Sequence, residues 1–157
     1  ARNLASADVD VLVRGATAPS FLKGLGYDVE VTSRIEQASG KPATTTSTAL
    51  INALKESGVS RVAFGAAYDG KVNGIAVNFL EANGDTALKL AREIDSPDAE
   101  AIVLACTNWK SMDVLEQLEQ ELGKPVFSTT QVSLWAALRM IGEKNPIPGY
   151  GRLLRQV

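Results

Sequence analysis

The chain has 157 residues, of which 45% are hydrophobic and 22% charged, and these values are typical of a globular domain with a buried core. No apolar run approaches the roughly 20 residues that a membrane span needs, which argues against a membrane partner and against the disordered class. Sixteen basic and eighteen acidic residues give a net charge of -2, so the chain lacks the basic surplus that a nucleic-acid partner requires.

Predicted strands and helices alternate along the chain. Short apolar, β-branched segments predict strands, and apolar residues at helical spacing predict helices. In chain order, the predicted elements are strand 9–14, loop 15–28, helix 29–38, extended segment 43–46, helix 47–57, strand 61–67, helix 71–82, helix 86–94, strand 101–105, helix 112–122, strand 126–128 and helix 132–141. This order predicts an α/β fold with parallel sheets flanked by helices.

One motif occurs twice at a constant offset. The tripeptides IEQ, GKP and TTS of residues 35–47 return as LEQ, GKP and STT in residues 118–130. The preceding strand ends also match, since Gly15-Ala16-Thr17 corresponds to Ala105-Cys106-Thr107. We therefore predict two pseudo-symmetric lobes with a site between them. The predicted units are a first-lobe portion at 1–57, a second lobe at 58–142 and a C-terminal tail at 143–157.

Two positions interrupt the predicted duplication. The second copy has a strand and two helices before its strand at 101–105, whereas the chain starts just before the equivalent strand of the first copy. We therefore expect the N-terminal part of the first lobe to be missing. A helix ending at Gly84 also meets a helix starting at Asp85 with no strand between them. This junction predicts a chain break or an absent segment, and a tight helical hairpin is the alternative.

Cys106 is the strongest candidate for chemistry. With no histidine and one cysteine, the chain cannot form histidine-dependent triads, disulfides or thiolate zinc sites, and we expect no metal. Cys106 follows the strand at 101–105, at the edge where open parallel sheets bind ligands. The amides of Thr107 and Asn108 lead toward the next helix and can bind an anion or favour a thiolate. The alternative is a small buried residue without chemistry.

A pseudo-twofold would bring the other strand end opposite Cys106. Ala16 would then face Cys106, and Thr17 and Thr107 would line the same pocket from two sides. Ser20, Gly24 and Gly26 follow in a predicted glycine-rich loop, which is either a lid over the site or an ordinary connection.

Three other polar residues are candidates for binding. The phenol of Tyr68, at the end of strand 61–67, could donate to an oxyanion, and the alternative is a surface turn residue without function. Thr46 and Ser47 lie where the extended segment 43–46 meets the helix predicted at 47–57. Their hydroxyls either cap this helix or reach a substrate carboxylate.

The single cysteine also indicates the cellular compartment of the protein. A free thiol fits a reducing compartment, and the start ARNLASADVD does not have the sequence of a signal peptide. We therefore expect a cytoplasmic protein.

Three segments resemble one family. They are AIVLACTNWKSMDVLEQLEQELGKPVFSTTQVSLWAALR, the preceding PATTTSTALINALKESGVSRVAFGAAY and the terminal PGYGRLL. They are similar to the aspartate/glutamate racemase superfamily, and within it to arylmalonate decarboxylases and maleate cis-trans isomerases. The resemblance implies a two-lobed α/β protein with a site between the lobes that needs no cofactor, and a longer N-terminal lobe than this chain shows.

The resemblance also implies roles for single residues. The racemases and isomerases use one cysteine from each lobe, whereas the decarboxylases keep the second-lobe cysteine and have glycine in the first lobe. This sequence has Ala16 at the first position, which leaves Cys106 as the proton donor. Thr17 and Tyr68 would be oxyanion-hole donors, and the amides of Thr107 and Asn108 would add further donors.

Two departures from the decarboxylase pattern leave the substrate open. Thr107 and Asn108 stand where the decarboxylases have two glycines, and Ala18 stands where they have a serine. The leading hypothesis is a cofactor-independent lyase that decarboxylates a malonate-type acid. The alternatives are an isomerase or racemase of a small dicarboxylate and a non-catalytic carboxylate binder. The expected partner is a small carboxylic or dicarboxylic acid, with homo-oligomerisation left open.

Overall fold

Two separate parallel sheets organise the chain in the computed structural model, which describes residues 1–66, 85–105 and 110–157. The first sheet pairs β1 (Leu12–Arg14) with β2 (Ala43–Thr45). The second sheet has the order β3 (Val62–Ala66), β4 (Ala101–Ala105) and β5 (Val126–Ser128). All of these pairs are parallel, which confirms the predicted α/β fold.

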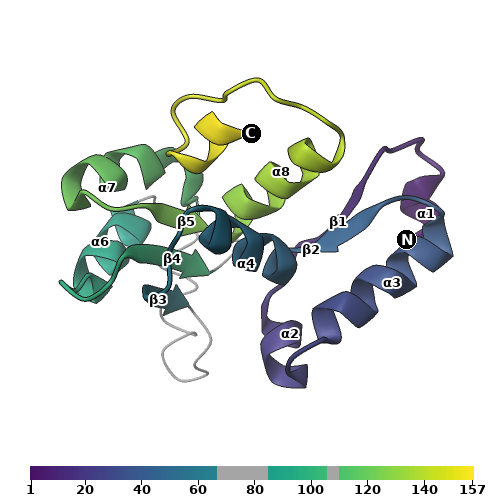
Figure 1. Cartoon of the computed structure of the whole chain (residues 1–157), viewed down its shortest axis with the longest axis horizontal. Coiled ribbons are helices and arrows are strands. Elements are labelled where there is room, and N and C mark those ends of the chain that lie inside the picture. The colour runs from purple at the N-terminus through teal and green to yellow at the C-terminus, as the bar shows by residue number, and fades with distance from the viewer. Residues whose placement is uncertain (67–84, 106–109) are drawn as a thin grey trace.

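Helices surround both sheets, and α4 lies between them (Figure 1). The described helices are α1 (Arg2–Ala5), α2 (Ala18–Lys23), α3 (Tyr27–Ser39), α4 (Thr46–Glu56), α6 (Asp85–Ile94), α7 (Leu115–Leu122) and α8 (Thr129–Met140), with 3-10 turns η1 (Met112–Val114) and η2 (Leu153–Gln156). In the described ranges, none of them has both the length and the apolar character needed to cross a bilayer.

The hydrophobic core is built on the two faces of β4. All five residues of this strand are buried, and its side chains alternate between two clusters. Ala101 and Val103 pack with α4, α8 and the C-terminal turn, including Trp135 and Leu154. Ile102 and Leu104 face α6 and α7 on the other side. Since strands buried on both faces are uniformly apolar, the sequence AIVLA has the pattern that a central parallel strand requires.

The predicted loop at 15–28 is wrong in part, because the structure forms α2 there. Pro19 suits the first turn of a helix, whose N–H groups have no intrahelical partner. Gly24 ends the helix with φ +89, a conformation that a residue with a side chain rarely adopts. The helix has only six residues, too short for apolar periodicity to reveal it.

Other predicted elements agree within a few residues. The helix predicted at 132–141 begins earlier, at Thr129, because the Ser128 side chain accepts the N–H of Gln131 and caps it. The predicted helix 71–82 and the predicted break between Gly84 and Asp85 lie outside the described residues. The proposed domain boundaries therefore stay a prediction.

The two repeats form the same local structure. Glu36 accepts the backbone N–H of Ala43 at 3.1 Å, and Glu119 accepts that of Val126 at the same distance. Each helix that carries the glutamate ends in a left-handed glycine, Gly40 or Gly123. Each following helix is capped by the side chain of the last strand residue, Thr45 or Ser128. These matched contacts show that the sequence repeat is also a structural one.

Candidate functional site

The strand registers show which residues of the two sheets are equivalent. Leu12 pairs with Ala43 in the first sheet, and Ile102 pairs with Val126 in the second. Since Ala43 and Val126 occupy equivalent places in the repeats, Leu12 and Ile102 are equivalent as well. Ala16 follows Leu12 by as many positions as Cys106 follows Ile102, so the registers support the sequence alignment that pairs position 16 with position 106.

Four of the sequence-predicted site residues lie outside the described residues. They are Cys106, Thr107, Asn108 and Tyr68. Their roles and the predicted approach of Cys106 to Ala16 therefore stay predictions. The described part of the site consists of the carboxyl ends of the strands and the first turns of α2, α4 and α8.

Thr17 and its neighbours form the junction between β1 and α2. Thr17 is the N-cap residue of α2 and is buried. Its carbonyl accepts the N–H of Ser20 at 3.0 Å, which closes the first helical turn. Ala16 and Ala18 on either side are half-buried. Both alanines have only a methyl group, so the buried Thr17 is the residue that brings a polar side chain to this junction.

Thr46 connects α4 to the end of β1 and to α8. Its hydroxyl lies 3.2 Å from the Arg14 carbonyl and 2.7 Å from the Ser133 hydroxyl. The Arg14 carbonyl also accepts the N–H of Ala16 at 2.9 Å. The three contacts hold the strand end of the first sheet against α8, which follows the last strand of the second sheet. The Thr46 hydroxyl therefore already has partners within the fold.

Ser47 differs from Thr46 in having no hydrogen-bond partner among the described residues. Its side-chain oxygen is buried in the first turn of α4, and the oxygen of Thr130 occupies the equivalent place in α8, also unpartnered there. The hydroxyl of Ser20 in α2 is in the same situation. Because buried hydroxyls normally have a partner, these positions are suited to accept or donate a hydrogen bond to a ligand.

Sequence reasoning missed Asp28 and Arg14. Asp28 lies in the first turn of α3 and accepts a 2.7 Å hydrogen bond from the Thr48 hydroxyl. One guanidinium nitrogen of Arg14, at the end of β1, is buried without a partner among the described residues. The spacing of strand ends could have indicated Arg14, whereas Asp28 belongs to a segment predicted as loop. No carboxylate cluster of the described ranges could hold a metal ion.

Comparison with known proteins gives concordant matches. The family model described as arylmalonate decarboxylase matches residues 1–94 and 85–154. The arylmalonate decarboxylase of Bordetella bronchiseptica is 31% identical over 178 residues, covering 98% of this chain and 74% of that protein. The maleate isomerase of Pseudomonas putida is 26% identical over 179 residues, covering 96% and 72%.

Solved structures show the same fold. A crystal structure of arylmalonate decarboxylase matches with a TM-score of 0.84 at 30% identity, covering 99% of this chain and 79% of that one. The Nocardia farcinica maleate cis-trans isomerase bound to Tris matches with a TM-score of 0.85 at 22% identity, covering 98% and 74%. The fold is thus shared by proteins with two different activities.

Proposed function

We propose, because the chain belongs to the arylmalonate decarboxylase family, that it is a cofactor-independent lyase that decarboxylates a malonate-type acid, with Cys106 as the proton donor. Its relatives are decarboxylases and isomerases, so family membership supports an enzyme of one of these two kinds. The observation that favours decarboxylation is the alanine at position 16, which the sequence repeat and the strand registers align with Cys106.

The chemistry needs one acid group and a set of fixed donors. When the bond to the departing carboxylate breaks, its electron pair moves onto the retained carboxylate and gives an enediolate. Hydrogen-bond donors arranged before the reaction stabilise this charge. We assign that role to Thr17, Tyr68 and the amides of Thr107 and Asn108. The Cys106 thiol then gives its proton to the carbon, and the thiolate recovers a proton from solvent.

The alanine at position 16 supports a reaction in which the α-carbon of the substrate receives a proton on one face only. Racemisation requires a group that removes a proton on one face and a group that returns one on the other. A methyl group can do neither, so the second acid/base group is lacking at this position. Ala16 and Ala18 would bound the pocket, and the hydroxyls of Thr46 and Ser47 would lie at its first-lobe side. The substrate would be a small acid whose retained carboxylate meets these donors.

A dicarboxylate isomerase or racemase is the second candidate. Its support is the match to maleate isomerases and the Thr107-Asn108 pair after the cysteine. A non-catalytic carboxylate binder is the third, since a pocket can outlast the loss of one cysteine. All three predict carboxylate binding, and they differ in CO₂ release and in exchange between isomers.

The test follows CO₂ release and isomer exchange on a panel of malonates and dicarboxylates. We expect CO₂ release by the wild type, and a loss of several orders of magnitude in Cys106→Ser, because a hydroxyl is a far weaker acid than a thiol. Ala16→Cys should add exchange of the product α-proton with solvent. Undiminished turnover of Cys106→Ser would contradict the mechanism. Isomer exchange without CO₂ release would favour the isomerase, and binding without turnover the binder.

A further inference from the structure

A cavity of about 380 Å³ lies between α2, α3 and α4. Its lining consists of Ser20, Gly24, Leu25, Asp28, Ser47 and Ile51. Ser20 is in the first turn after Thr17, and Ser47 follows Thr46, whose hydroxyl contacts the end of β1. Two of its lining residues are therefore close in the chain to residues that contact the end of β1, where the proposed reaction takes place. Its volume is in the range of small-molecule sites.

Two polar side chains of the cavity are buried and lack a hydrogen-bond partner in the part of the chain that the structure describes. Ser20 is 7% exposed and Ser47 is 4% exposed, and neither hydroxyl has a hydrogen-bond partner among the described residues. An unsatisfied buried hydroxyl costs free energy, and a ligand that fills the cavity would remove that cost. The rim is apolar, since Leu25 and Ile51 are both exposed there.

Asp28 gives the cavity a negative charge. In the described part of the chain no lysine or arginine forms an ion pair with it, and its Oδ2 accepts from Thr48 at 2.7 Å. Thr48 lies 3.0 Å from the Thr45 hydroxyl, which also accepts the N–H of Thr48. The carboxylate is therefore held in place by the cap of α4. A carboxylate only accepts hydrogen bonds, so the cavity favours a donor and repels an anion.

We propose that this cavity is the substituent pocket of the site, and that it selects acids whose side group carries a hydroxyl or amino donor over acids with an unsubstituted or anionic side group. This proposal rests on the proposed function in one respect, namely that the retained carboxylate of the substrate binds at the strand ends. Ser20, Ser47 and Asp28 bind the polar end of the side group, while Leu25 and Ile51 cover its apolar part. Phosphate or a second carboxylate on the side group is disfavoured by Asp28.

The test measures binding of arylacetates, which have already lost the departing carboxylate and cannot react. Dissociation constants for phenylacetate, 4-hydroxyphenylacetate and 4-carboxyphenylacetate are measured by titration calorimetry on the full chain. We expect the hydroxyl compound to bind about fivefold to tenfold more tightly than phenylacetate, the usual effect of one or two net hydrogen bonds. The carboxyl compound should bind most weakly.

Variants of the pocket assign the preference to its residues. Ser47→Ala and Ser20→Ala should each lower the preference for the hydroxyl compound. Asp28→Asn keeps an acceptor for Thr48 but removes the charge, so it should strengthen binding of the carboxyl compound, a gain that unfolding cannot produce. Ser33→Ala, on the exposed side of α3, is the matched control and should change nothing.

The outcomes separate this pocket from the reaction. Equal affinities for the three acids, or no binding of any, would overturn the pocket. A preference that Asp28→Asn and Ser47→Ala leave unchanged would overturn it too. The hydroxyl preference in a protein that releases no CO₂ would support the pocket and contradict the lyase. Turnover of malonates without any preference would support the lyase and contradict the pocket.

Discussion

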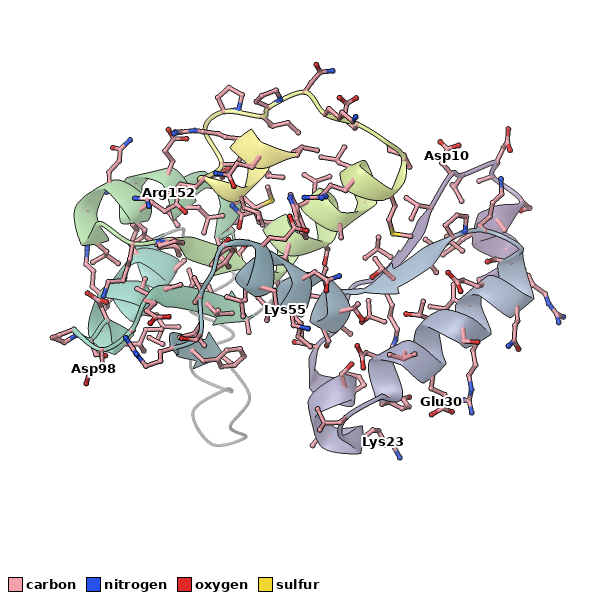
Figure 2. The ribbon with its side chains drawn as sticks, in the orientation of Figure 1. Asp10, Lys23, Glu30, Lys55, Asp98 and Arg152 are labelled. Atoms are coloured by element: carbon pink, nitrogen blue, oxygen red, sulfur yellow. The ribbon has the colours of Figure 1, made fainter. Side chains whose placement is uncertain are left out.

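The two repeats have the same contacts at their centre and different surroundings. Glu36 and Glu119 each accept the first N–H of the following strand at 3.1 Å. Glu36 is exposed, whereas Glu119 is 5% exposed, because the C-terminal segment covers it. Arg152 donates its N–H to the second oxygen of Glu119 at 2.7 Å, and Figure 2 shows Arg152 beside α7. The equivalent glutamate is thus at the surface in the first repeat, whereas in the second repeat it is buried and binds the C-terminal segment.

A second pair of equivalent positions extends this difference. Gln131 and Thr48 follow their capping residues at the same distance in the chain. Gln131 donates to the carbonyl of Tyr150 at 2.6 Å and so holds the C-terminal segment. Thr48 donates instead to Asp28, beside the cavity. The second repeat therefore uses this position for folding, and the first repeat uses it to place a charge at a candidate binding site.

Gly151 allows the C-terminal segment to pack closely against Gln131 and Glu119. It has φ +83, and a Cβ there would lie 3.0 Å from the Gln131 amide nitrogen and 3.2 Å from Glu119 Oε2. Leu153 and Leu154 then enter the core cluster with Trp135. The segment predicted as a C-terminal tail is therefore packed into the protein at its end.

The repeats should differ most in how much stability is lost when the equivalent glutamates, Glu36 and Glu119, are each replaced by glutamine. A glutamine at 119 can accept from only one of the two N–H groups and presents its own NH₂ to the other. We expect Glu119→Gln to lower the free energy of unfolding by about 2–3 kcal/mol, and Glu36→Gln by roughly 0.5 kcal/mol. Urea unfolding of the matched pair measures both. Equal losses would contradict the assignment of Glu119 as the buried anchor of the C-terminal segment.

The pH dependence of stability should isolate Glu119 further. Burial raises the pKa of Glu119 above its usual value, although hydrogen bonds from Val126 and Arg152 oppose the shift. The folded protein therefore holds this proton more strongly than the unfolded chain, and the contribution of Glu119 declines as pH rises from 4.5 through the raised pKa. Hydrogen bonds lower the pKa of Glu100 and of Glu121, and these two groups change the stability in the opposite direction as pH rises.

Comparing the unfolding free energies of the wild type and Glu119→Gln cancels the effects of Glu100 and Glu121, because both proteins contain them. The stability advantage of the wild type should shrink as pH rises above 4.5, and urea midpoints at several pH values measure it. An advantage that grows with pH in this window would show that the hydrogen bonds outweigh burial at Glu119.

The sequence predicted the fold because its signals are local. The apolar AIVLA strand and the repeated GKP before a strand are patterns that can be read in a few consecutive residues, and the structure has strands at these places. The positions of Asp28 and Arg152 depend instead on contacts with distant residues. Asp28 lies in no motif, and Arg152 belongs to the terminal PGYGRLL, a resemblance that does not indicate its contact with Glu119. The short helix α2 lacked a periodic pattern, so the cavity that it borders could not be predicted from sequence.

The smallest effect should come from the exposed ion pair that joins the two repeats. Arg139 of α8 donates to Glu56 of α4 at 2.5 Å and lies 5.0 Å from the Trp135 ring centre. Since the side chains are 43% and 50% exposed, solvent screens the pair. We expect Arg139→Ala to cost under about 1 kcal/mol, with Glu56→Gln costing less because it leaves the stacking on Trp135 intact. Urea unfolding at low and high salt measures both, and only the ion-pair part should weaken with salt. A loss as large as that of Glu119→Gln would show that stability depends on the joint between α4 and α8 more than on the buried glutamate of the second repeat.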